Sequence, residues 1–266
     1  MILMGIVVVV LLVSGVMAFK GKGKPQGDPR THPQSAPGLY QEALALQKNQ
    51  QWLKAKETYQ LLMSRYPDYE DMETIQKNLE QVNLQIIYSH GPSSKTIFYD
   101  VQSGDTLGKL AKKFSTTIDL IKKKNSLTSD TIQVGRELAI WTGVFNILID
   151  KSQNILILKD GDEVIKVYDV ATGANNITPV GSFKITSKLV NPVWFKAGVI
   201  IPPESPQNIL GTRWLGFDLP GYGIHGTLEP DKLRQQLTAG CIRMRNEEVE
   251  ELYSLIPIGT TVLVMD

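Results

Sequence analysis

Residues 144–266 are made of short runs rich in β-branched side chains, separated by sequences that favour turns. The runs cover 147–149, 155–158, 164–170, 181–187 and 260–264. Asp160 and Gly161 suit a tight hairpin turn between two of them, because glycine takes a positive φ without steric cost. Many short strands joined by turns predict a β sandwich or barrel. One helix is expected after Asn246, which is placed to act as its N-cap.

The first residues of the chain predict a membrane anchor or an export signal. Residues 1–19 are apolar and uncharged, and a membrane-spanning helix needs about 20 apolar residues. Residues 16–18 also resemble the small-residue cleavage site of a signal peptide. A buried core helix is the less favoured alternative. Residues 20–37 are rich in Gly, Pro, Ser, Gln and charge, so they predict a flexible linker.

Residues 38–88 carry apolar side chains at helical spacing, with breaks at 49–50 and at 66–68. The pattern predicts a helical hairpin followed by a third helix over about 71–87. The segment resembles one tetratricopeptide repeat in three packing residues, Trp52, Ala55 and Tyr59. A generic hairpin or spacer explains the pattern equally well. Either structure could bind a protein partner, and neither suggests chemistry.

Residues 96–142 predict a compact strand–helix–helix–strand module. A first strand is followed by a turn, where Asp105 is placed to cap a helix. Thr116 or Thr117 is placed to cap a second helix, and a strand returns over 132–140. The module is preceded by a second short linker and is therefore expected to fold as a unit.

Two runs in this module resemble a LysM domain, Y-x-V-x-x-G-D-T-L at 99–107 and I-x-V-G-x-x-L-x-I at 132–140. The resemblance implies binding of N-acetylglucosamine-containing glycans, such as the strands of bacterial peptidoglycan, or chitin. It also implies a shallow groove between two loops, formed by Gly104, Asp105, Thr106, Leu127 and Thr128. The six lysines between residues 109 and 124 predict a solvated face more than a surface for anionic wall polymer.

Cys241 is the only cysteine of the chain, and His225 is the only histidine of residues 144–266. A cysteine attacks as its thiolate, and because a free thiol has a pKa of about 8.5, a base must remove its proton. Histidine can do so near neutral pH. Gly240 would let the backbone approach a reacting carbonyl and stabilise its oxyanion. These residues predict acyl transfer through a thioester, although a lone cysteine is more often a small buried hydrophobe.

Three other classes of function find no support. The net charge of +1 gives no argument for nucleic-acid binding. A single cysteine, three histidines and no H-E-x-x-H motif predict no metal site of the zinc type. The G-x-G-x-x-G match at 221–226 lacks the following helix that a dinucleotide site requires.

Six runs across residues 144–266 resemble the YkuD-like L,D-transpeptidase catalytic domain. They are P-V-G-S-F at 179–183, R-W-L-G at 213–216, G-Y-G-I-H-G-T at 221–227, T-A-G-C-I-R-M at 238–244, N-x-x-V-x-x-L-Y at 246–253 and I-P-I-G-T-x-V at 256–262. The resemblance implies a mainly-β sandwich. The whole chain is then expected to be a multidomain protein with an apolar anchor or signal helix, a helical hairpin segment, a βααβ LysM module and this catalytic domain.

The resemblance also implies a role for each matching residue. Cys241 is the nucleophile and His225 the general base, with the Gly226 carbonyl orienting the imidazole. The amides of Gly240 and Cys241 are expected to meet the oxyanion. Two further residues are expected near the substrate, Thr238 and Arg243. Ala239 departs from the family pattern, because many members have a second histidine at this position.

The implied substrate is a peptidoglycan tetrapeptide stem. Cys241 attacks the carbonyl of the third residue, D-alanine leaves, and an amine of another stem completes a 3→3 cross-link. A lysine of a wall-attached protein and water are alternative acceptors, and no metal or organic cofactor is implied. Two rival functions are a carboxypeptidase or endopeptidase with the same dyad and a non-catalytic wall-binding scaffold. The expected location is the cell envelope, in the periplasm or at the outer membrane face, with residues 1–19 either retained as an anchor or removed.

Overall fold

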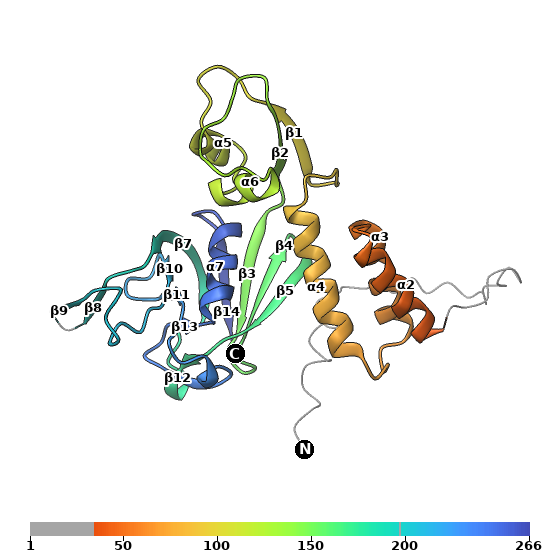
Figure 1. Cartoon of the computed structure of the whole chain (residues 1–266). Coiled ribbons are helices and arrows are strands. Elements are labelled where there is room, and N and C mark those ends of the chain that lie inside the picture. The colour runs from red at the N-terminus through yellow and green to blue at the C-terminus, as the bar shows by residue number, and fades with distance from the viewer. Residues whose placement is uncertain (1–34, 197) are drawn as a thin grey trace, which may run out of the picture.

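The computed structural model describes residues 35–196 and 198–266. The predicted apolar segment at 1–19 and the predicted linker up to residue 34 lie outside these residues. No helix in the described part of the chain is long and apolar enough to cross a membrane. Figure 1 shows the described parts in chain order, with helices first, then the LysM module, then a large β sheet.

Three helices form the first described segment: α2 (Ala36–Lys48), α3 (Trp52–Arg65) and α4 (Met72–Tyr88). The hydroxyl of Ser35 accepts a hydrogen bond from the Gly38 N–H, so the last three residues assigned to the linker begin the first helix. α3 ends before Pro67, since proline disfavours helical backbone in the preceding residue. The predicted helices are confirmed, whereas the tetratricopeptide resemblance stays a prediction.

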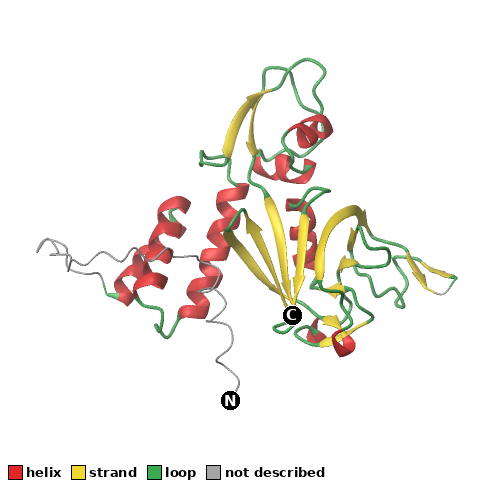
Figure 2. Cartoon of the chain, turned by 180° about the vertical axis from the view of Figure 1, so that it is seen from behind, coloured by secondary structure: helices red, strands yellow, loops and turns green. Residues whose placement is uncertain are grey.

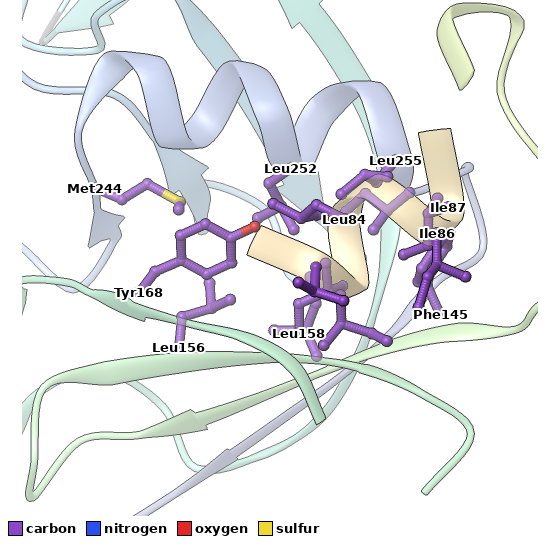
Figure 3. Close-up of a cluster of buried hydrophobic side chains, with 14 of the residues drawn as sticks. Leu84, Ile86, Ile87, Phe145, Leu156, Leu158, Tyr168, Met244, Leu252 and Leu255 are labelled. Carbon is purple, nitrogen blue, oxygen red and sulfur yellow. The ribbon is translucent and has the colours of Figure 1, made fainter. Parts of the chain in front are cut away.

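The C-terminal half of α4 belongs to the core of the domain formed by residues 144–266, which the sequence did not predict. Leu84, Ile86 and Ile87 are buried there. Figure 3 shows them between Leu158 of the sheet and Leu255 of α7 (Asn246–Leu255). An apolar helix face is stable only when it is removed from water, and here the sheet covers it. The helical segment and the sheet therefore share one hydrophobic core.

Polar side chains of α4 also cover the edge of the sheet, which is formed by β5 (Glu163–Asp169). The Asn83 amide donates to the backbone carbonyls of Val164 and Ile165 at 3.3 and 3.2 Å. A carboxylate oxygen of Glu80 accepts from the Val167 N–H at 3.3 Å. An uncovered edge would leave such backbone groups open to pairing with another chain. α4 therefore takes the place of a further strand.

Glu80 makes this contact dependent on pH. Burial raises the pKa of Glu80 to about 7, although hydrogen bonds from Gln76 and Val167 oppose the shift. The folded state thus holds the proton more tightly than the unfolded state, and stability falls as pH rises from about 4.5 through 7. Glu80→Gln keeps the accepting oxygen and removes the charge. We expect this variant to be about 2–3 kcal/mol more stable than wild type at pH 8 and equally stable near pH 4.

Urea unfolding of both proteins at the two pH values measures this difference. Glu73→Gln on the same helix is the matched control, because Glu73 is exposed and pairs with Lys77 across one helical turn. Its effect should stay within about 0.5 kcal/mol at either pH. Equal stability of the Glu80→Gln variant and wild type at pH 8 would contradict the prediction.

The LysM module has the predicted order of elements: β1 (Thr96–Asp100), α5 (Leu107–Lys113), α6 (Ile118–Lys124) and β2 (Glu137–Trp141). β1 and β2 pair in antiparallel fashion. Thr117 caps α6, as one of the two alternatives predicted. The last strand is shorter than expected, because residues 132–136 turn at Gly135, which has a φ of 82°.

The sequence suggested Asp105 as the cap of α5, but the structure has another residue in that role. The Thr106 hydroxyl accepts the Lys109 N–H at 3.2 Å and takes that role. Asp105 instead accepts the Gln102 N–H at 2.8 Å and the Tyr99 hydroxyl at 2.9 Å. The side chain therefore closes the turn before the helix, and the next residue begins the helix.

Lys124 is an exception to the predicted solvated face of lysines, because it is only 1% exposed. Its ammonium group donates to the carbonyls of Ile87 and Ser89 at 3.1 and 2.6 Å, at the C-terminal end of α4. It also lies 5.3 Å from the centre of the Trp141 ring. A cation is favourable at a helix C-terminus. This lysine consequently joins the LysM module to α4.

The catalytic domain contains one curled eight-stranded sheet in the order β13-β11-β10-β7-β14-β3-β4-β5. Its remaining strands are β3 (Phe145–Asp150), β4 (Ile155–Asp160), β7 (Gly181–Val190), β10 (Arg213–Phe217), β11 (Gly223–His225), β13 (Ile242–Arg243) and β14 (Thr261–Met265). The predicted mainly-β domain is thus present, and its large sheet is one curled sheet. β14 joins its halves by pairing with both β3 and β7, and α7 packs against β10 and β11.

Two small two-stranded sheets lie beside the large one. β6 (Thr172–Gly173) pairs with β12 (Gln236–Thr238), close to the turn that precedes β13. β8 (Trp194–Lys196) pairs with β9 (Val199–Ile201) in a hairpin that projects from the domain, as Figure 2 shows. Short 3₁₀ turns follow β6 and precede β12, at Ala174–Asn176 and Pro230–Lys232.

Candidate active site

Two neighbouring parallel strands, β11 and β13, lie at the positions of the predicted dyad. β11 ends at His225, which pairs with Arg243 of β13 in the strand register. Cys241 directly precedes β13, two residues before Arg243. The Cys241 sulfur contacts Gly221 and Gly223 at the start of β11, so it lies beside the strand that ends at His225, although sixteen positions separate the two residues in the sequence.

The imidazole of His225 is fixed by its neighbours. Its Nδ1 lies 2.7 Å from the Gly226 carbonyl oxygen. Because a carbonyl only accepts hydrogen bonds, Nδ1 carries the proton, and in the neutral ring Nε2 then holds a lone pair. The ring stacks on Trp214 from the paired strand β10, with centroids 5.9 Å apart and planes inclined by 20°. The geometry thus presents an imidazole of one tautomer in one orientation.

The environment keeps this imidazole neutral. His225 is 2% exposed. Burial lowers its pKa to about 4, although hydrogen bonds to the Gly226 and Leu210 carbonyls oppose the shift, and the positive charge of Arg243 lowers the pKa further. A neutral imidazole with a free Nε2 is the form that accepts a proton.

The Cys241 thiol is partly buried and also neutral. Burial raises the pKa of this thiol, and the Gly223 N–H and the charge of Arg243 oppose the rise. The sulfur lies 3.4 Å from the Gly221 carbonyl oxygen, to which the S–H donates. A thiol in this state reacts only after a base has taken its proton.

A tight turn before β13 is held by Thr238. Its hydroxyl accepts the Gly240 N–H at 3.1 Å and donates to the Cys241 carbonyl at 2.6 Å. The Gly240 N–H, expected to meet an oxyanion, is thus already bonded within the protein. Thr238 itself is 4% exposed, so its side chain supports the turn. The resemblance implied instead that Thr238 lies near the substrate. Gly240 has a φ of 117°, and a Cβ there would lie 2.7 Å from the Tyr222 ring, so the position requires glycine.

Arg243 lies beside the dyad with a side chain that is 12% exposed. One of its terminal nitrogens is 3.5 Å from a carboxylate oxygen of Glu229. Its Nε–H is buried and has no hydrogen-bond partner among the described residues. The guanidinium lies at the position that the resemblance assigned to a substrate carboxylate, and only its small exposed part could reach a substrate.

Asn246 and Trp214 support His225, and their contacts were not predicted. The Asn246 side chain accepts the Thr212 N–H at 3.2 Å and donates to the Thr227 carbonyl at 3.0 Å. It thereby ties the segment after His225 to the segment before β10, while Arg245 is the residue at the N-cap of α7. The predicted N-cap role of Asn246 is therefore wrong. Its amide instead bonds two segments that only the tertiary fold brings together.

The residues of the predicted glycan groove lie in the LysM module, in the loop before α5 and in the loop after α6. Gly104, Thr106 and Thr128 are exposed, and Asp105 and Leu127 are partly buried. Gly104 has a φ of 83°, and its carbonyl oxygen accepts a hydrogen bond from the Lys109 ammonium group at 2.7 Å. The groove residues are thus on the surface of the module, apart from the dyad.

Comparison with known proteins gives a consistent family. Residues 145–264 match the L,D-transpeptidase catalytic domain (YkuD), and residues 99–141 match the LysM domain. The Bacillus subtilis (strain 168) protein YqjB, which carries the name of an L,D-transpeptidase, is 42% identical over 126 residues, covering 45% of this chain and 70% of that protein. The YkuD protein of the same strain, which also carries the name of an L,D-transpeptidase, is 30% identical over 173 residues, covering 62% of this chain and 97% of that protein.

Among solved structures, an L,D-transpeptidase from Mycobacterium tuberculosis H37Rv is 18% identical with a TM-score of 0.41, covering 50% of this chain and 64% of that chain. The relatives from Bacillus subtilis are matched over most of their own length, and the two domain matches follow in order along the chain. The chain therefore belongs to the L,D-transpeptidase family, a family of cysteine-dependent acyltransferases that act in peptidoglycan metabolism.

Proposed function

We propose that the protein forms 3→3 cross-links between peptidoglycan stems through a thioester on Cys241. One observation supports this most directly, the 2.7 Å contact between His225 Nδ1 and the Gly226 carbonyl. In the neutral ring it leaves Nε2 without a proton, on the strand next to the segment that begins at Cys241. A general base needs this lone pair, and a third group that orients the base is the usual arrangement around an acylated nucleophile.

In the proposed reaction, Nε2 of His225 takes the thiol proton while the sulfur attacks the carbonyl carbon of the third stem residue. The oxyanion meets the Cys241 N–H, since the Gly240 N–H is bonded to Thr238. The C–N bond then breaks, and the departing D-alanine amine takes the proton from His225. An acceptor amine then attacks the thioester and gives a proton to His225. The C–S bond breaks, and His225 passes the proton to the sulfur, which restores the Cys241 thiol.

Substrate binding is assigned to two parts of the chain. Arg243 offers its partly exposed guanidinium to a carboxylate of the stem, for which this group is well suited. The LysM loops at 104–106 and 127–128 bind glycan strands and so raise the local concentration of stems. Because α4 is packed against the catalytic domain, a protein partner of residues 38–88 would contact the outer faces of α2 and α3.

The family and the LysM domain together suggest a location outside the cytoplasm. Within that location, we propose the periplasm or the outer face of the cytoplasmic membrane. Retention of residues 1–19 as an anchor remains part of this proposal.

Mass spectrometry of the products from a disaccharide-tetrapeptide separates the candidate functions. A transpeptidase releases D-alanine and produces dimers joined through their third residues. A carboxypeptidase with the same dyad gives only trimmed tripeptide monomers, and an endopeptidase cleaves added dimers. A wall-binding scaffold leaves the tetrapeptide unchanged. We expect dimers, and we expect a covalent stem adduct on the peptide that contains Cys241. Unchanged tetrapeptide after incubation with folded protein would overturn the proposed function.

A further inference from the structure

We propose that Thr178 is a positioning residue for acylation, which orients the peptide group between Gly240 and Cys241. The inference rests on the proposed function, because it concerns the oxyanion formed in that reaction. Thr178 lies in the loop after β6, 62 positions before Gly240 in the sequence. It is 2% exposed, and no substrate contact is assigned to it. Its influence on the reaction would pass entirely through Gly240.

The direction of the Thr178 hydroxyl is determined by its two partners. Oγ1 accepts the Gly173 N–H at 2.8 Å and donates to the Gly240 carbonyl at 3.0 Å. A hydroxyl has a single proton. Because the Gly173 N–H occupies a lone pair, that proton is free to bond the Gly240 carbonyl. The bond is buried, so water does not compete for it as it would at the surface.

The loop that carries Thr178 is held firmly in place. The buried ammonium group of Lys151 donates to the Thr178 carbonyl at 2.8 Å and to the Asn176 carbonyl at 3.3 Å. The same ammonium pairs with Asp266 at 2.9 Å. A Cβ at Gly173 would lie 2.7 Å from the Thr178 nitrogen, so the two ends of the loop are in close contact. The Thr178 hydroxyl therefore has a fixed position from which to hold Gly240.

This hydrogen bond determines where the Cys241 N–H points. In a trans peptide, the carbonyl and the following N–H point in opposite directions. The Gly240 carbonyl faces Thr178, so the Cys241 N–H faces away from Thr178. The other N–H of the turn, that of Gly240, is bonded to Thr238. The turn is thus held at two peptide groups, and the Cys241 N–H is the donor left for an oxyanion.

Glycine makes this support necessary. Gly240 has no side chain to restrict its backbone, and its φ of 117° is outside the range that other residues favour. Without the Thr178 hydroxyl, the peptide group after Gly240 can rotate and its carbonyl is left buried and unpaired. Misdirection of one oxyanion donor should slow acylation by about 10- to 100-fold, somewhat less than complete removal of such a donor.

The test compares Thr178→Val with Thr178→Ser and Thr172→Val. Valine keeps the shape of threonine and removes the hydroxyl, whereas serine keeps the hydroxyl. Thr172 is a matched control, because it is 1% exposed and its hydroxyl bonds Asn154 at 2.8 Å, away from Gly240. Acylation by a tetrapeptide stem is followed by intact mass over a range of substrate concentrations. Alkylation of Cys241 by iodoacetamide is measured in parallel, since it forms no oxyanion.

For Thr178→Val we expect the maximal acylation rate to fall about 10- to 100-fold, with the apparent KM and the alkylation rate within about twofold of wild type. Thr178→Ser should restore most of the rate, and Thr172→Val should match wild type. If circular dichroism shows Thr178→Val to be unfolded, Thr178→Ala takes its place with the same expectation.

Three results would overturn the role of Thr178: an unchanged acylation rate in the folded variant, an equal loss in Thr172→Val, or an equal loss of alkylation. A wild-type protein that forms no acyl-enzyme would overturn the proposed function and this inference together. An acylating wild type beside an equally fast Thr178→Val variant would overturn this inference alone.

Discussion

Cys241→Ala is expected to abolish acyl-enzyme formation and to lower D-alanine release by at least about 10⁴-fold, because the remaining residues offer no other thiol. The side chain is only partly buried, and its sulfur makes only weak hydrogen bonds with the backbone of Gly221 and Gly223. We therefore expect a change of less than about 1 kcal/mol in the free energy of unfolding. Release of D-alanine from a disaccharide-tetrapeptide, measured for both proteins, checks the prediction.

A binding measurement distinguishes loss of chemistry from loss of structure. The Cys241→Ala variant should still sediment with purified peptidoglycan to the same extent as wild type, because the LysM loops lie apart from the dyad. Cys241→Ser is a second control with nearly the same shape. It should also be inactive, since the hydroxyl is far less acidic than a thiol. D-alanine release by Cys241→Ala at the wild-type rate would refute Cys241 as the nucleophile.

His225→Asn is expected to reduce the acylation rate by about 10²- to 10⁴-fold, the usual contribution of a general base. The asparagine amide can still donate to the Gly226 carbonyl, so the variant removes mainly the Nε2 lone pair. In wild type, the rate should fall only below about pH 4, where the imidazole becomes protonated. In the variant, the rate should instead rise about tenfold per pH unit toward the pKa of the thiol, because only free thiolate then reacts.

The pH profile of acylation from pH 4 to 9 tests this change of slope. Trp214→Phe serves as the control, since it retains an aromatic ring against position 225 and leaves the base intact. Its profile should keep the wild-type shape. A His225→Asn profile parallel to that of wild type would show that another group takes the proton.

Sequence alone determined those features that depend on neighbours along the chain. Helical spacing located α2, α3 and α4, and β-branched runs between turns located five strands of the large sheet: β3, β4, β5, β7 and β14. The motifs around Cys241 and His225 identified the family and the two residues proposed for catalysis. Short motifs and periodicities of this kind reflect the local backbone, which a few consecutive residues define.

Tertiary structure decided what depends on residues far apart in sequence. β14 pairs with both β3 and β7 and so produces one sheet, although its own pattern fits a sandwich equally well. The apolar face of α4 predicted burial without identifying the sheet that covers it. Lys124 and Thr178 bond carbonyls 37 and 62 positions away. Such hydrogen bonds form only when the fold brings their partners together, because nothing in the local spacing of residues encodes the partner.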